Sequence, residues 1–192
     1  MKKILILYAS NAGSTVKVAQ AVADELTKTA HVDVLPLEKV TSLDDYSAIV
    51  LGAPMIVGWH RGALAFLKRN QAALSQKKVA IFVTCVNLTK TDETSLEGVL
   101  LFIDEKLPKA PKNPARLGIK ENYSTPKNYL TPILKLVKPV SIGIFGGSLQ
   151  YFSMKWWQVP FVLLAIQAAP GDKRNWKAIS EWASQLTGKF AE

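Results

Sequence analysis

The sequence predicts an α/β fold in which helices cover both faces of a five-stranded parallel sheet. Continuous apolar runs, typical of strands that are buried on both faces, alternate with segments whose apolar residues recur at helical spacing. Hydrophobic residues make up 48% of the 192 residues, which is enough for the core of one globular domain. We expect the five strands at residues 4–8, 31–35, 47–53, 79–83 and 140–145.

Helices are expected between these strands and after the last of them. The first begins near Thr15, and the second covers residues 63–74, after a strand that we expect Pro54 to end. A third helix is expected over residues 95–106, from the spacing of Leu96, Val99, Leu100 and Ile103. The last is expected over residues 175–189, from the apolar stripe of Trp176, Ile179, Ala183, Leu186 and Phe190.

Composition narrows the classes of function. The single cysteine, Cys85, excludes an intramolecular disulfide and a cysteine-based metal cluster, and two histidines far apart in sequence make a metal site unexpected. No apolar stretch is long enough to cross a bilayer, and the short apolar run after Met1 leads into an amphipathic helix, so we expect a cytoplasmic protein. The net charge of +9 favours anionic partners, such as lipid headgroups, nucleic acid or an acidic small molecule.

A hydroxyl-rich turn, the first loop, joins the first strand to the first helix. It consists of Ser10, Asn11, Ala12, Gly13, Ser14 and Thr15. A helix N-terminus offers unpaired N–H groups to an anion, and Gly13 lets the backbone approach it closely. The loop lacks the glycine-lysine motif of nucleoside triphosphatases and the three-glycine motif of dinucleotide sites, so it suits a single terminal phosphate. The alternative is an ordinary turn with a serine or threonine N-cap.

Two apolar loops follow the third and fourth strands. The second loop contains Pro54, Met55, Ile56, Val57, Gly58 and Trp59, and the third contains Thr84, Cys85, Val86, Asn87 and Leu88. Ligands of parallel sheets bind outside the carboxyl ends of the strands, so these loops are candidates to bind a flat ring. Alternatively, Trp59 packs over its own helix and Cys85 is a small apolar residue at a strand end.

With these loops in place, the chain resembles flavodoxin-like proteins over essentially its whole length. The first loop resembles their Ser/Thr-x-Thr-Gly-x-Thr phosphate motif, although Ala12 removes one hydroxyl. Within that superfamily, residues 52–60 followed by Ala63-Leu64 resemble the branch that contains menaquinone-dependent protoporphyrinogen oxidase. Residues 86–88 and 146–151 match further short motifs of that branch.

The resemblance implies a flavodoxin-like three-layer sandwich with strand order 2-1-3-4-5 and FMN as the cofactor. The FMN phosphate would bind the first loop, and the isoalloxazine ring would lie between the second and third loops. A backbone flip at Gly58 on flavin reduction is a further hypothesis, because glycine is unconstrained in φ.

A basic, proline-rich insertion is expected at about residues 106–139 of this single domain. Residues 106–138 carry eight basic residues against one acid, Glu121, and half of the ten prolines, with a short helix expected near residues 128–137. It is either a solvated loop or a surface that attracts anionic lipids or porphyrin propionates. Nucleic acid is not expected, because the insertion has only two aromatic residues, Tyr123 and Tyr129, and no binding motif.

Residues 151–166 join aromatic and basic residues to an apolar helix that is too short to span a membrane. This composition suits a membrane interface. The alternatives are a helix buried on the sheet and a contact within a homodimer.

These features predict an FMN-dependent oxidoreductase, similar to protoporphyrinogen oxidase and peripheral on the inner membrane face. The resemblance implies electron transfer from a reduced porphyrin-type substrate to a quinone. Only His60 and Arg61 are candidates for an acid or base. One alternative is an electron-transfer module that docks on a protein partner, and another is a flavodoxin-like domain that binds without flavin.

Overall fold

The computed structural model describes residues 3–10, 13–55, 58–149 and 171–191. Its middle layer is a seven-stranded sheet with the order β2-β1-β3-β4-β9-β7-β6. The strands are β1 (Lys3–Tyr8), β2 (His31–Pro36), β3 (Ala48–Met55), β4 (Lys78–Cys85), β6 (Ser95–Leu96), β7 (Val99–Ile103) and β9 (Ser141–Gly146). All neighbours are parallel except β6 and β7, which are antiparallel.

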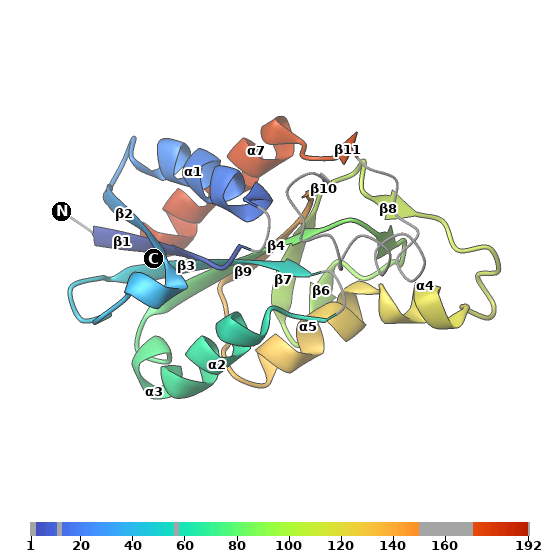
Figure 1. Cartoon of the computed structure of the whole chain (residues 1–192), viewed down its shortest axis with the longest axis horizontal. Coiled ribbons are helices and arrows are strands. Elements are labelled where there is room, and N and C mark those ends of the chain that lie inside the picture. Colours follow the sequence, from blue (N-terminus) through green and yellow to red (C-terminus); the bar gives the residue numbers. More distant parts are fainter. Residues whose placement is uncertain (1–2, 11–12, 56–57, 150–170, 192) are drawn as a thin grey trace, which may run out of the picture.

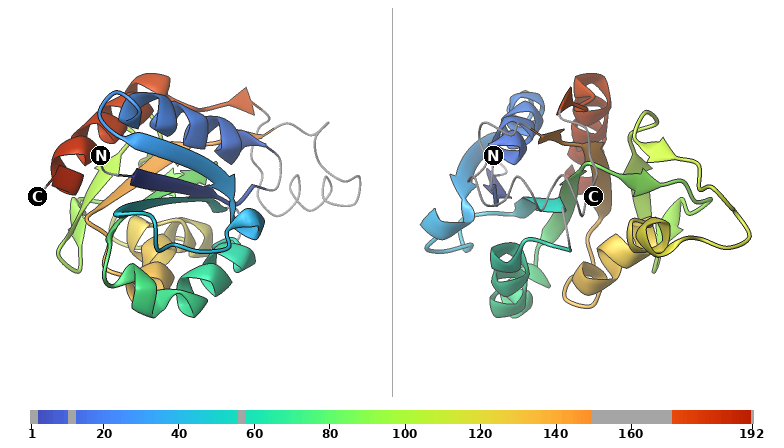
Figure 2. Two further views of the ribbon diagram at one scale, coloured as in Figure 1. Left: turned by 90° about the vertical axis from the view of Figure 1, so that its left-hand side faces the viewer. Right: turned by 45° about the vertical axis from the view of Figure 1, so that its right-hand side comes forward.

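Helices cover both faces of this sheet, which makes a three-layer sandwich (Figures 1 and 2). On one face lie α1 (Ser14–Leu26) and α7 (Trp176–Ala191). On the other lie α2 (Arg61–Arg69), α3 (Gln71–Leu74) and α5 (Pro126–Leu134). Two further helices are short: η1 (Leu37–Lys39) and α4 (Ile119–Tyr123). Four short strands form two separate pairs. β5 (Leu88–Thr89) pairs with β8 (Pro108–Lys109), and β10 (Ser148–Leu149) pairs with β11 (Gly171–Asp172).

The five strands expected from the sequence are present, and their order 2-1-3-4-5 is confirmed as β2-β1-β3-β4-β9. Every residue of β3 and β9 is buried, as is every residue of β4 after Lys78. This burial explains the continuous apolar runs of the central strands, because helices cover both of their faces. The third strand continues through Pro54 to Met55, since proline removes only one N–H donor from the ladder.

The prediction of a helix over residues 95–106 is wrong, because this segment forms β6 and β7. Glu97 and Gly98 join the two strands as a two-residue turn, with φ of 50° and 81°. Positive φ at both central residues is typical of the turns that favour hairpins. β7 then pairs with β9, so the hairpin extends the sheet by two strands beyond the expected five.

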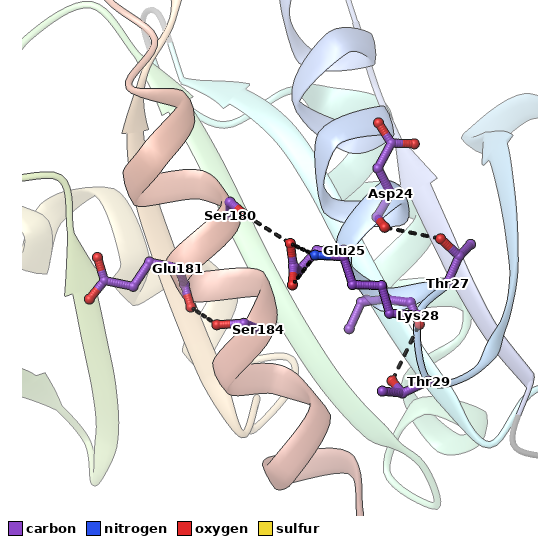
Figure 3. Close-up of polar contacts among 9 residues, drawn as sticks. Asp24, Glu25, Thr27, Lys28, Thr29, Ser180, Glu181 and Ser184 are labelled. Carbon is purple, nitrogen blue, oxygen red and sulfur yellow. Dashed lines mark hydrogen bonds and ion pairs between the residues drawn. The ribbon is translucent and has the colours of Figure 1, made fainter.

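The helix α7 packs on the sheet beside α1. Trp182 is fully buried and lies against Phe82 and Phe145, with ring centroids 6.2 and 5.6 Å away. On the outer side, the Glu25 carboxylate of α1 accepts hydrogen bonds from Ser180 of α7 and from Lys28 (Figure 3). These contacts lower the pKa of Glu25, with Lys28 as the larger cause.

Trp176 does not belong to the buried stripe of α7, contrary to the expectation from spacing. It is the first residue of the helix and is exposed, with the Arg174 guanidinium 4.6 Å from its ring centroid. The other four expected residues, Ile179, Ala183, Leu186 and Phe190, are buried. Trp182 continues their helical spacing.

The proline-rich insertion is folded against the rest of the domain through part of its length. In α5, which begins two residues before the expected start, the Thr125 side chain accepts a hydrogen bond from the N–H of Asn128, and Pro126 occupies the first turn. Glu121, its single acid, accepts hydrogen bonds from the N–H groups of Lys112 and Gly118, which lower its pKa. The segment is therefore partly ordered by its own backbone contacts rather than being a plain solvated loop.

Within the described residues, no helix is both long enough and apolar enough to cross a membrane. The expected apolar segment at residues 151–166 lies outside the described residues.

Candidate functional site

The three loops singled out from the sequence follow strands that are direct neighbours in the sheet. β1 pairs with β3 up to Tyr8 and Gly52, and β3 pairs with β4 up to Met55 and Cys85. Because the strands are parallel, their carboxyl ends lie along one edge of the sheet, which is on the right in Figure 1. The first, second and third loops therefore leave the sheet at the same edge.

The first loop leads into α1 through a left-handed residue. Gly13 is the N-cap of α1, with a φ of 78°, and its N–H donates to Ser10 Oγ over 2.9 Å. Among the described residues no side chain caps the helix by a hydrogen bond, and the first turn has no acidic residue. The backbone N–H groups that begin α1, at Ser14 and Thr15, are therefore suited to an anion.

Thr15 joins the first loop to the third. Its hydroxyl lies 3.2 Å from the hydroxyl of Thr84, and both side chains are buried. The pair connects the first turn of α1 to the end of β4, although 69 residues separate the two threonines. Asn11 and Ala12, the other members of the first loop, lie outside the described residues.

The second loop turns the chain from β3 into α2. Gly58 has a φ of 84°, and Met55 forms an antiparallel bridge with Trp59. A Cβ atom added to Gly58 would lie 3.3 Å from the Tyr123 hydroxyl of α4, so the insertion approaches this loop. Ile56 and Val57 lie outside the described residues.

Trp59 is 7% exposed and belongs to the core cluster on the α2 side of the sheet. Its Nε1 is buried and has no hydrogen-bond partner among the described residues. Trp59 is therefore a core residue at the end of the second loop. The two acid–base candidates lie at the start of α2, with half-buried His60 at its N-cap and exposed Arg61 at its first position.

The backbone of the third loop is fixed by donors from three parts of the chain that are far from it in sequence. Consecutive carbonyl oxygens, those of Cys85, Val86 and Asn87, each accept a hydrogen bond. The donors are the Gly147 N–H at 2.8 Å, the Lys173 Nζ at 2.9 Å and the Tyr129 hydroxyl at 3.1 Å. These hydrogen bonds fix the position of the loop backbone relative to the rest of the site.

The insertion also packs on the third loop and the residues that follow it. The Tyr129 ring belongs to α5, and the N–H of Thr89 donates to Ser124 O over 2.9 Å. Lys90 N–H donates to Lys109 O over 2.8 Å, beside the short pairing of β5 with β8. The insertion therefore contributes to the frame of the candidate site.

Burial at this edge of the sheet shifts the pKa values of three side chains. Burial raises the pKa of the Cys85 thiol to about 12, so this thiol stays protonated, as expected of an apolar residue at a strand end. Burial also raises the pKa of Tyr129, which keeps its hydroxyl a donor. Burial and the neighbouring charge of Lys109 both lower the pKa of Lys173.

Lys173 and Tyr129 were not predicted as site residues. They lie 87 and 42 residues from the loop positions that they contact, and neither stands in a local motif. Among the described residues, no group of three or more histidine, cysteine, aspartate or glutamate side chains could bind a metal ion.

Two solved flavodoxin structures support the fold. Flavodoxins from the domain Archaea and from Fusobacterium nucleatum, the latter solved bound to flavin mononucleotide, each align over 99% of both chains. Their TM-scores are 0.52 and 0.50, at 13% and 12% identity. A short-chain flavodoxin associated with a bacterial microcompartment aligns over 44% of this chain and 62% of its own length, at 21% identity and a TM-score of 0.41.

The family comparison covers most of the chain. No curated protein matches this sequence. The model of the flavodoxin domain family matches residues 5–173, which include all three loops and Lys173. The chain therefore belongs to the flavodoxin domain family.

Proposed function

We propose that this protein binds FMN and transfers electrons through it. The observation that carries this proposal is that the N-terminus of α1, which no described side chain caps, meets two apolar loops at one edge of the sheet. The first can bind a terminal phosphate and the others can enclose a flat ring. Membership of the flavodoxin domain family and the likeness to a flavodoxin solved with flavin mononucleotide support the same cofactor.

The residues of the three loops fit this cofactor. In the proposed arrangement, the N–H groups at Ser14 and Thr15 and the Ser10 and Ser14 hydroxyls bind the phosphate, while Gly13 keeps the turn open. The second and third loops contact the ring. FMN supplies the capacity to accept and release electrons, and the protein supplies the position and electrostatics of the ring.

For the substrate, we propose oxidation of a reduced porphyrin-type molecule with a quinone as the electron acceptor. The resemblance to the menaquinone-dependent protoporphyrinogen oxidase branch supports it. So does the basic insertion at the candidate site, whose charge suits the propionates of a porphyrin or an anionic membrane surface. In this proposal, His60 and Arg61 are the candidate side chains for proton transfer.

The second candidate is an electron carrier that docks on a protein partner. The structural likeness to flavodoxins supports this reading as much as the enzymatic one. The net charge of +9 means that such a partner would present an acidic surface.

A visible spectrum of the purified protein tests the cofactor. We expect the absorption bands of an oxidised flavin, and release by heat should yield FMN rather than FAD. A colourless protein that does not quench the fluorescence of added FMN would overturn the proposal.

A second assay separates the two candidates. Quinone-coupled oxidation of a porphyrinogen, measured with and without anionic liposomes, should show turnover that the liposomes stimulate. Fast electron exchange with an acidic redox protein in the absence of porphyrinogen turnover would favour the carrier.

Gly58→Val is expected to shift the reduction potential of bound FMN. A β-branched residue opposes the φ of 84°, and its Cβ would press on Tyr123. The matched control is Gly98→Val, which has a similar φ of 81° but lies in the β6–β7 turn. Dye-equilibrated reduction of both variants should show the shift for Gly58→Val alone, and an unchanged potential in that variant would contradict the prediction.

A further inference from the structure

The Lys173 ammonium is bound to the backbone of the third loop. Its Nζ donates to Val86 O over 2.9 Å, and its own N–H donates to Gly147 O over 3.1 Å. The N–H of Gly147 in turn donates to Cys85 O. The side chain and backbone of Lys173 are thereby both connected to the residues at the end of β4, so its position relative to the loop is fixed.

The positive charge of Lys173 has no acidic partner among the described residues. The four ion pairs found there do not include it, and the adjacent Asp172 is paired with Arg174. Lys173 is half-buried, and the charged group that acts on it most strongly, Lys109, is also a cation. A cation that is partly removed from water and not neutralised acts over a longer range than a solvated one.

We propose that Lys173 is a positioning and electrostatic residue for the flavin ring, which fixes the third loop and favours the reduced, anionic form of the cofactor. This inference rests on the proposed binding of FMN. It assigns a specific role to a residue that lies far from the three loops in sequence.

The sign of the effect follows from the charge balance of the reaction. Reduction adds two electrons and one proton to FMN, so the reduced ring carries one more negative charge than the oxidised ring. A neighbouring cation lowers the free energy of the reduced form relative to the oxidised form. Lys173 should therefore make FMN bind more tightly when reduced and raise its two-electron potential.

The test compares the affinities of oxidised and dithionite-reduced FMN in three variants. Lys173→Met removes the charge, Lys173→Arg keeps it, and Lys78→Met removes a charge elsewhere. Lys78 is an exposed residue at the opposite end of β4, about 23 Å from Cys85 by strand rise. Fluorescence quenching of FMN measures the affinity of the oxidised form. Equilibration with dyes of known potential measures the potential of bound FMN, from which the ratio of reduced to oxidised affinity follows.

We expect Lys173→Met to lower the ratio of reduced to oxidised affinity by about tenfold. For a two-electron couple, this change is a potential shift of about −30 mV. Lys173→Arg and Lys78→Met should retain the ratio of the unaltered protein. A retained ratio in Lys173→Arg would show that the positive charge is what matters. A purely steric role would not depend on the charge of the side chain.

Three outcomes would overturn the inference. The ratio could be unchanged in Lys173→Met, it could fall equally in Lys173→Arg, or it could fall equally in Lys78→Met. In each case the unaltered protein still binds FMN, and the proposed function stands. If the unaltered protein binds no FMN in either redox state, the proposed function and this inference are both wrong.

Discussion

Gly146→Ala is expected to lower the free energy of unfolding by about 3 kcal/mol. A Cβ atom at this position would lie 2.0 Å from the carbonyl oxygen of Lys173 and 2.7 Å from its carbonyl carbon. Backbone atoms cannot move aside as a flexible side chain can. Lys173 is moreover held by its N–H bond to Gly147 O and by its ammonium on Val86 O.

The neighbouring glycine provides the control for this prediction. A Cβ atom at Gly147 would meet its nearest atom, Cys85 O, at 3.6 Å, which is an ordinary contact. Gly147→Ala should therefore change the stability by less than about 0.5 kcal/mol. Urea denaturation of both variants measures the difference, and similar midpoints for the two would show that the close approach at Gly146 does not limit stability.

Trp182→Ala is expected to cost about 4 kcal/mol, because it removes the largest fully buried side chain between α7 and the sheet. The ring contacts Phe82 and Phe145, and its Nε1 donates to the buried Ser141 Oγ over 3.0 Å. Neighbouring rings cannot collapse into a cavity of this size without losing their own contacts.

Trp182→Phe separates the packing from the hydrogen bond. It retains an aromatic ring against Phe82 and Phe145 but leaves Ser141 Oγ without its donor, so we expect a smaller loss of about 1–2 kcal/mol. The two variants are compared by denaturation followed by tryptophan and tyrosine fluorescence and by circular dichroism. A loss below about 1 kcal/mol for Trp182→Ala would contradict the assigned role of this ring.

The parallel sheet could be predicted because burial on both faces leaves a distinctive apolar run in each central strand. The hairpin of β6 and β7 could not be predicted from the same signal. The apolar residues between Leu96 and Ile103 fit the spacing of a helix as well as that of a strand. The segment is a strand because β7 pairs with β9, a contact between distant parts of the chain. The local signal for the turn was Glu97-Gly98, where a residue that accepts positive φ precedes the second strand.

The location of the candidate site could also be predicted, since parallel strands bring the loops after β1, β3 and β4 to one edge. The frame of the site could not. The Thr15–Thr84 contact and the bonds from Tyr129 and Lys173 to the third loop join residues that are far apart in sequence. Such contacts depend on how α5 and the residues before α7 pack against the end of the sheet. No local sequence pattern predicts this packing.

The hairpin of β6 and β7 also determines what the sheet presents to other molecules. It places β9 between two neighbours, so that strand has no free row of N–H and C=O groups. On this side the sheet ends at β6, a two-residue strand whose Ser95 and Leu96 pair with Leu100 and Val99, and β2 forms the other edge. A short terminal strand is a poor template for edge-to-edge pairing, so the hairpin leaves less backbone available for pairing on this side of the sheet than an exposed β9 would.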